Sequence, residues 1–267
     1  MKIILFGSNG MLGTYLNSYL SIKHEVVPLT RKDYDLSANN MDESSLFHFL
    51  KEVVNDGDVI INAAGIIKQR EHNINDMIMV NSLFPNFLAK FKTLVNCNVI
   101  HITSDSVFSG RDGGYDETAK HDCVDYYGQS KSLGEHPQLT SIRTSTIGEE
   151  KNNRKSILEW VRSNSGKTIS GYLNHKWNGV TCLQLSKIIN SIIDYKIYWD
   201  GVRHIHSPNT VSKIELCGMI NDVYKLGITI EGVETPENCF RDLSTINKKF
   251  DIPTLREQIM EMNKYKI

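Results

Sequence analysis

The sequence predicts an α/β fold, a doubly wound parallel sheet followed by a smaller C-terminal lobe. Through about the first hundred residues, short apolar runs alternate with segments of helical periodicity, which is typical of βαβ units with helices on both sheet faces. Beyond residue 145 this alternation weakens. The length of 267 residues and the 40% hydrophobic content also suit one large α/β lobe with a smaller one beside it.

Each expected element follows from the spacing of its apolar residues. Continuous apolar runs of four to eight residues predict strands, and apolar residues three and four positions apart predict helices. In chain order we expect strand 2–6, helix 11–20, strand 24–29, helix 44–54, strand 58–62, helix 77–94, strand 98–102 and a later helix 183–193. We therefore place a first domain at residues 1–145 and a second at 146–267, and expect the elements around 180–206 to rejoin the first.

The charge and cysteine content argue against several classes of protein. Lys and Arg number 30 against 31 Asp and Glu, so no basic excess points to a nucleic-acid or membrane partner. The five cysteines are scattered without a CxxC pair, which favours neither a metal site nor a disulfide framework. Because no long apolar segment is present, we expect neither signal peptide nor membrane span, and a cytoplasmic protein.

The segment GSNGMLG directly follows the first strand and opens the first helix. Glycines at this spacing allow a tight turn, close approach of the backbone to a pyrophosphate and close helix packing, with the helix N-terminus facing the negative charge. The alternative is a glycine-rich turn without a ligand. We predict a Rossmann-type NAD(P)-binding domain whose turn contacts the cofactor through Gly7, Asn9, Gly10, Met11, Leu12 and Gly13.

Arg31 follows the second strand at the position where NAD-specific proteins usually carry an acid on the ribose hydroxyls. A guanidinium can instead pair with the 2′-phosphate of NADPH. An exposed loop arginine without this role is the alternative. We expect NADPH as the cofactor, with NADH left open.

Tyr127 and Lys131 are four residues apart on an expected helix, so they share one face. A phenol with a reference pKa of about 10 is a poor acid or base at neutral pH, and an adjacent cation stabilises its phenolate. Such a pair also occurs by chance on solvated helices. Behind a glycine turn and a strand that ends in hydroxyls, Thr103 to Ser106, it predicts a proton-transfer site.

Five segments together resemble one family. They are GSNGMLG at 7–13, NAAG at 62–65, TSDSVFSG at 103–110, YYGQSK at 126–131 and IRTS at 142–145. They are similar to the extended short-chain dehydrogenases, specifically the dTDP-4-dehydrorhamnose reductase family. The resemblance implies an NAD(P)-binding lobe with a small C-terminal lobe, mainly 146–267, over a sugar nucleotide.

The resemblance also implies roles for individual residues. Ser104 would hydrogen-bond the sugar ketone, Tyr127 would donate the proton, and Lys131 would hold the nicotinamide ribose and lower the pKa of Tyr127. Asp105 would help to fix the sugar or its loop, although Ser and Asp at a strand end often only cap backbone groups. The cofactor would also be framed by Asp35, Leu36, Ala63, Ala64 and Gly65.

Two substitutions change the expected substrate pocket. Ser106 stands where the rhamnose reductases commonly have Tyr, and Thr146 stands where they have Trp. A related branch, which epimerises C3 and C5 as well as reducing C4, has Cys at the Ser106 position and a His or Lys on a later loop. Here His175 and Lys176 are available without the Cys, and Lys176 also suits a solvated surface cation.

The sequence is therefore compatible with three functions. The leading one is NADPH-dependent reduction of the C4 ketone of a dTDP- or UDP-linked 4-keto-6-deoxyhexose, with Ser104, Asp105, Ser106, Thr146 and Lys176 at the substrate. The second is a combined 3,5-epimerase and 4-reductase. The third is a non-catalytic binding subunit, because a regulatory subunit of methionine adenosyltransferase also resembles this family. The sequence leaves the oligomeric state open, with a homodimer as one alternative.

Overall fold

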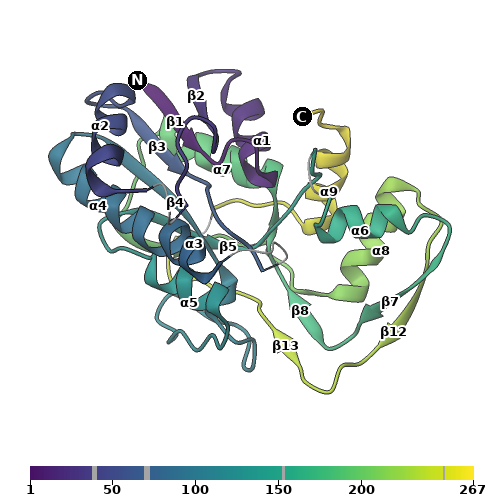
Figure 1. Cartoon of the computed structure of the whole chain (residues 1–267). Helices are drawn as coiled ribbons and strands as arrows, with labels where there is room; N and C mark the ends of the chain where they lie inside the picture. The colour runs from purple at the N-terminus through teal and green to yellow at the C-terminus, as the bar shows by residue number, and fades with distance from the viewer. Residues whose placement is uncertain (38–40, 69–72, 152–153, 249) are drawn as a thin grey trace.

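Six parallel strands form the central sheet of the computed structural model (Figure 1). The structure describes residues 1–37, 41–68, 73–151, 154–248 and 250–267. Across the sheet the strands lie in the order β10 (Gly201–His204), β5 (Thr140–Thr144), β4 (Asn98–Ser104), β3 (Val59–Asn62), β1 (Lys2–Phe6) and β2 (Glu25–Leu29). The predicted α/β fold with a parallel sheet is thus confirmed.

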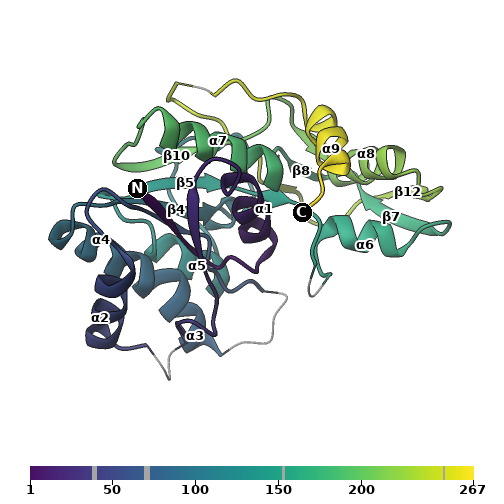
Figure 2. The ribbon, with the colours of Figure 1, turned by 90° about the horizontal axis from the view of Figure 1, so that it is seen from above.

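Helices cover both faces of this sheet (Figure 2). Ile3 and Leu5 of β1 pack toward α1 (Met11–Leu20) and α7 (Cys182–Asp194), which lie on one face. Their neighbours Ile4 and Phe6 belong to the opposite core, with α2 (Glu43–Val53) and α4 (Phe84–Leu94). Burial on both faces explains why the central strands read as continuous apolar runs rather than alternating ones.

The helix expected over 77–94 is divided into three segments. These are α3 (Ile74–Ile78), a π-helical turn (Met79–Leu83) and α4. The π-helical turn brings Asn81 and Ser82 against α5 (Tyr126–Leu133), where the Ser82 hydroxyl donates to Ser130 O at 2.7 Å and the Asn81 amide donates to Ser130 Oγ at 3.0 Å. Buried polar groups of the turn therefore fix the helix that carries Tyr127.

The C-terminal part has its own apolar core, which includes Trp177, Leu216 and Ile259. Tyr15 of α1 also belongs to this core, so the two parts of the molecule pack directly on one another. The elements of this part are β6 (Thr146–Ile147), α6 (Ile157–Ser163), β7 (Thr168–Tyr172), β8 (His175–Trp177), β9 (Val180–Thr181), β11 (Val211–Ser212), α8 (Lys213–Tyr224), β12 (Thr229–Val233), β13 (Cys239–Phe240) and α9 (Leu255–Lys264). They form small sheets in the pairs β6 with β9 and β7 with β12, and in the order β11, β8, β13.

A late segment of the chain returns to the first part of the molecule. Phe240 N donates to Gly110 O at 2.7 Å, and Tyr115 N donates to Asp242 O at 3.1 Å. These bonds fix the segment after β13 beside the loop that follows β4 and its short 3₁₀ turn (Asp105–Val107). Residues around 240 therefore lie beside the C-terminal end of β4, near Ser104.

Among the described residues, no helix combines the length and the apolar character needed to cross a membrane.

Candidate active site

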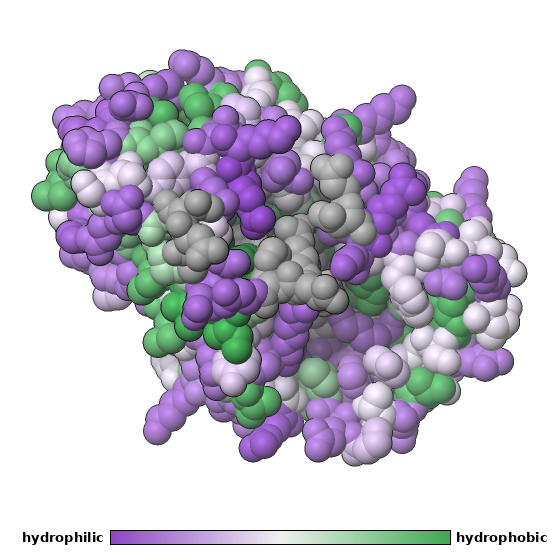
Figure 3. Space-filling model, viewed as in Figure 1, coloured by the Kyte–Doolittle hydropathy of each residue, from purple (hydrophilic) through white to green (hydrophobic). Residues whose placement is uncertain are grey.

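A cavity of about 720 Å³ lies between the two parts of the molecule, at the carboxyl ends of β1, β3 and β4. In an open α/β sheet this edge, where the strand order reverses between β1 and β3, is the usual place for a ligand. Figure 3 shows a hollow between the two parts of the surface. The cavity is lined from both sides, by Gly10 and Ser104 of the first part and by Thr146 and Ser156 of the second.

The glycine turn forms one end of the cavity. Gly7 has a φ of +76°, and a Cβ on it would lie 2.7 Å from Ala64 N, so only glycine fits there. A Cβ on Gly13 would overlap Gly7 O, because α1 packs directly on the turn. Gly10, the N-cap of α1, provides no side-chain hydrogen bond, so the first N–H groups of this helix are left for an anion.

The cavity lining includes most of the residues predicted to hold the cofactor. These are Gly7, Asn9, Gly10, Met11, Leu12, Arg31, Asp35, Leu36, Ala63, Ala64 and Gly65. Gly13 lies behind the turn, as its packing requires. The lining and the open helix terminus fit a dinucleotide.

Arg31 lies at the far end of this lining. Its Nε is 3.7 Å from Asp35 Oδ1, and 58% of its side chain is exposed. This ion pair joins two residues that were predicted to bind the cofactor. It orients the Arg31 guanidinium, which remains accessible to a ligand.

Ser104 and Tyr127 come together at the other end of the cavity. Ser104 ends β4, Tyr127 lies in the first turn of α5, and both residues line the cavity. Ser104 Oγ also accepts from Ser106 N at 3.1 Å and lies 3.2 Å from Asp105 Oδ1. A strand end and a helix start thus place two hydroxyls side by side facing the cavity.

Burial raises the pKa of the Tyr127 phenol above its ordinary value. The Ser104 hydroxyl and the charge of Arg241 act in the opposite direction, and Asp105 adds to the increase. Loss of solvation therefore outweighs both of these effects, and the lowering of this pKa by Lys131 stays a prediction. The phenol is protonated at neutral pH and can act as a proton donor.

Lys131 is buried beneath Tyr127 on the same helix. Its Nζ lies 3.5 Å from Ile102 O, and a Cβ on Gly65 would lie 3.0 Å from this Nζ. Burial lowers the pKa of Lys131 to about 8, while Glu135 raises it. The ammonium therefore borders the small residues that follow β3.

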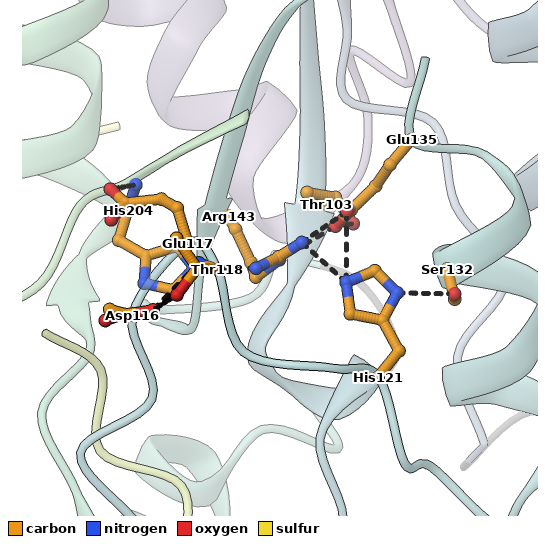
Figure 4. A network of polar contacts seen from close by, with 9 residues as sticks. All are labelled: Thr103, Asp116, Glu117, Thr118, His121, Ser132, Glu135, Arg143 and His204. Atoms are coloured by element: carbon orange, nitrogen blue, oxygen red, sulfur yellow. Dashed lines mark hydrogen bonds and ion pairs between the residues drawn. The ribbon is translucent and has the colours of Figure 1, made fainter. Parts of the chain in front are cut away.

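The polar side chains at the end of β4 contribute both to the cavity and to a polar network behind it. Asp105 and Ser106 line the cavity, and Thr146 lies across from them. Burial raises the pKa of the Asp105 carboxyl, against the charges of Arg241 and Lys213. The Thr103 hydroxyl instead donates to Glu135 Oε1 at 2.9 Å, in a polar network behind the site (Figure 4).

The structure does not bring Lys176 into this cavity. The Lys176 side chain is exposed, and its Nζ lies 5.3 Å from the centroid of the Phe240 ring. His175 Nε2 is 2.8 Å from Thr235 Oγ1. Among the described residues, neither side chain belongs to the lining.

Arg241 is a cavity residue that the sequence analysis missed. Its Nη1 donates to Ser106 Oγ at 3.2 Å, so a residue of the C-terminal part contacts the cluster after β4. The local sequence, Cys239-Phe-Arg-Asp242, carries no motif that could have revealed this position. Lys155, Ser156 and Ile157 also line the cavity without having been expected there.

A family comparison agrees with this geometry. The sequence model of the RmlD substrate binding domain family matches residues 1–235. The chain belongs to this family. The match covers both the glycine turn and the helix that carries Tyr127 and Lys131.

Several curated relatives share one name, dTDP-4-dehydrorhamnose reductase. A dTDP-4-dehydrorhamnose reductase of Aggregatibacter actinomycetemcomitans is 27% identical over 94% of this chain and 94% of its own. A reductase of the same name from Mycolicibacterium smegmatis is 32% identical over 52% of this chain, and the match spans only 42% of that relative's length. The spore coat polysaccharide biosynthesis protein SpsK of Bacillus subtilis is 27% identical over 55% of this chain, and the match spans 51% of the length of SpsK.

Solved structures show the same fold as this RmlD family chain. The dTDP-4-dehydrorhamnose reductase of Bacillus anthracis, in complex with NADP, superimposes with a TM-score of 0.83 at 22% identity, over 99% of both chains. The Clostridium acetobutylicum reductase gives a TM-score of 0.81 at 21% identity, also over 99% of both.

Proposed function

We propose that this protein reduces the C4 ketone of a nucleotide-activated 4-keto-6-deoxyhexose with NADPH. The proposal rests chiefly on Ser104, Tyr127 and Lys131, which line the same cavity as the glycine turn. Family membership and the names of the curated relatives support the same substrate class.

Tyr127 is the proton donor in this proposal. Reduction of a ketone needs a proton on the oxygen as the hydride arrives at carbon, and a protonated phenol facing the cavity can supply it. Ser104, which lines the cavity together with Tyr127, binds the same ketone oxygen and orients it. Two donors on one oxygen stabilise the negative charge that develops there during reduction.

Lys131 provides a buried positive charge behind Tyr127. An ammonium near the phenol stabilises the phenolate that remains after the proton has been donated. Its place beside Gly65 also suits a hydrogen bond to a ribose hydroxyl. The sugar ring is held by Asp105, Ser106 and Thr146, which line the same end of the cavity.

The cofactor residues fit a nicotinamide dinucleotide. The glycine turn and the open N-terminus of α1 bind its pyrophosphate, and the Arg31 guanidinium pairs with a 2′-phosphate. When bound, this group supplies the hydride for the reduction. The exposed Arg31 is the feature that favours NADPH over NADH.

A direct assay tests the proposal. The purified protein is incubated with NADPH and dTDP- or UDP-linked 4-keto-6-deoxyglucose or 4-dehydrorhamnose, and NADPH absorbance is followed while the sugar product is identified. We expect oxidation of NADPH matched one to one by a 4-hydroxy sugar. Binding of NADPH without turnover of any of these ketones would overturn the proposal and favour a binding subunit.

A further inference from the structure

Lys68 and Asp125 form an ion pair beside the active site. Lys68 Nζ lies 2.5 Å from Asp125 Oδ2, and Lys68 belongs to the cavity lining. Lys68 lies in the loop that follows β3, while Asp125 immediately precedes α5. The pair therefore joins the loop that carries the expected cofactor residues to the helix that carries Tyr127 and Lys131.

Asp125 uses its two carboxylate oxygens for different partners. Oδ1 accepts from Gly128 N at 2.9 Å and thereby caps the first turn of α5, and Oδ2 is the oxygen that pairs with Lys68. The main-chain oxygen of Asp125 also accepts from Gln129 N at 3.0 Å. Because Tyr127 lies between the cap residue and Gly128, one side chain connects the Lys68 ammonium to the turn that contains the phenol.

The first turn of α5 is also packed against the segment that follows β4. A Cβ on Gly128 would lie 2.3 Å from Ser106 O, so only a glycine allows the helix to approach this segment so closely. The turn therefore lies between the polar end of β4 and the loop after β3. Lys68 holds it on the second of these sides.

The middle of α5 is fixed separately from its first turn. Asn81 Nδ2 donates to Ser130 Oγ at 3.0 Å and to Ile66 O at 2.9 Å, in a buried position. These contacts lie about one helical turn beyond the phenol. At the start of the helix the Tyr126 side chain is 63% exposed. The position of the phenol therefore depends on the tie to Lys68 as well as on the buried contacts.

The exposure of the ion pair indicates that its main role is not stability. The Lys68 and Asp125 side chains are 46% and 28% exposed, and ion pairs at such positions contribute little to the free energy of unfolding. The geometry of a proton donor matters far more, since a displacement of about 1 Å can cost roughly 100-fold in rate. A substrate in the cavity also removes water from Lys68, which strengthens the attraction between the two charges.

We propose that Lys68 is a positioning residue: through Asp125 it holds the first turn of α5 so that the Tyr127 phenol stays aligned with the substrate ketone. This inference rests on the proposed function, because Lys68 acts through the proposed proton donor. In this role Lys68 does not contact the reacting atoms. Loss of the ion pair should therefore lower kcat and leave the KM for the ketone and the affinity for NADPH near their wild-type values.

Three variants test the ion pair directly. Lys68→Met removes the ammonium, Asp125→Asn removes the carboxylate but keeps an oxygen for the helix cap, and the double variant removes both charges. Each single variant should lower kcat about 10-fold, and the double variant should lower it no further, because all three break one interaction. Lys68→Arg should restore most of kcat. Because the charge of Asp125 raises the pKa of Tyr127, kcat is compared on the pH-independent plateau, where the phenol is protonated in every variant.

Amide hydrogen exchange examines the helix without any turnover. The amides of Gly128 and Gln129 should exchange faster in Lys68→Met than in wild type, with and without NADPH, while the amides of β4 keep their protection. Lys90→Met is the matched control, because Lys90 Nζ lies 2.8 Å from Glu43 Oε2 in an exposed ion pair outside the described cavity lining. This control should match wild type in kcat and in exchange.

Two results would overturn the inference. Wild-type kcat and wild-type exchange in a folded Lys68→Met protein would show that the ion pair does not position Tyr127. A higher KM for the ketone at unchanged kcat in Lys68→Met, absent from Asp125→Asn, would make Lys68 a direct substrate contact instead. If the wild-type protein reduces none of the ketones, the proposed function fails, and the exchange at Gly128 still decides whether Lys68 holds the turn.

Discussion

Arg143 and Glu135 form a buried ion pair that connects the central sheet to the end of the helix bearing Tyr127 (Figure 4). Their side chains are 2% and 6% exposed. Glu135 also accepts from Thr103, which directly precedes Ser104, and lies four residues beyond Lys131. Glu135, which is paired with Arg143, therefore joins the strand that carries Ser104 to the end of the helix that carries Tyr127.

Two histidines also contact Arg143. His204 Nε2 lies 2.8 Å from Nη1, and His121 Nε2 lies 2.7 Å from Nη2. Burial lowers the pKa of His204 to about 4 and lowers that of His121 as well, and the Arg143 charge adds to both effects. Both imidazoles are therefore neutral acceptors, and Glu135 is the counter-charge of the guanidinium.

Glu135→Gln should change the pH dependence of activity. Burial lowers the pKa of Lys131 to about 8 and Glu135 raises it, so removing the carboxylate lowers this pKa further. Because a lysine loses its charge as the pH rises through its pKa, the alkaline loss of kcat should begin at lower pH in the variant. The measurement is kcat and KM against pH, with the KM for NADPH little changed.

Stability provides the control for this variant. A buried Arg143 without its counter-charge costs about 3–5 kcal/mol of unfolding free energy, measurable by urea denaturation. The double variant Glu135→Gln with Arg143→Met removes one charge of each sign, so it should recover stability while keeping the alkaline shift, which depends on Glu135. An alkaline limb at the wild-type pH in a folded Glu135→Gln protein would contradict the coupling to Lys131.

Tyr127→Phe should lower kcat by roughly a hundred- to ten-thousandfold, since it keeps the ring and removes the proton donor. NADPH affinity and thermal stability should remain near wild type. Tyr126→Phe is the matched control, because Tyr126 is the preceding residue of α5 and is 63% exposed. Comparable turnover in the two variants would exclude Tyr127 from the chemistry.

Arg31→Ala should weaken NADPH far more than NADH. Only the 2′-phosphate offers a charge-assisted pair, so the expected loss of NADPH affinity is about 10- to 100-fold. The neighbouring Lys32→Ala variant controls for a general loss of positive charge. Fluorescence titration with both cofactors measures the effect, and equal losses for NADPH and NADH would show that Arg31 does not bind the phosphate.

Local sequence patterns predicted much of this fold and site, because turns and helix faces depend on residues that are close together in the sequence. The Gly7 turn can be predicted from its spacing, and the pair of Tyr127 and Lys131 from its spacing together with the glycine turn and the strand that ends in hydroxyls. The cavity lining includes all three residues. The pKa of Tyr127 could not be predicted in the same way, since burial depends on the packing of distant segments. Arg241 was missed for a similar reason: its place beside Ser106 depends on backbone bonds between residues about 130 positions apart.

The protein should reduce its substrate without epimerising it. Epimerisation beside a ketone needs one group to remove a proton from a ring face and another to return a proton to the opposite face. Ser106 is a weak acid in place of the cysteine expected of an epimerase, and among the described residues Lys176 lies outside the cavity lining. We therefore expect slow or absent exchange at C3 and C5.

The test supplies the unepimerised 4-keto-6-deoxyglucose nucleotide in deuterated water, with NADPH and no separate epimerase. NMR and mass spectrometry of the product should show hydrogen retained at C3 and C5, with reduction at C4 proceeding. Rapid entry of deuterium at C3 and C5 would contradict the prediction that the protein does not epimerise its substrate. Loss of that exchange in Lys176→Ala, with exchange retained in the neighbouring His175→Ala, would then identify Lys176 as the base and require β8 to move toward the cavity.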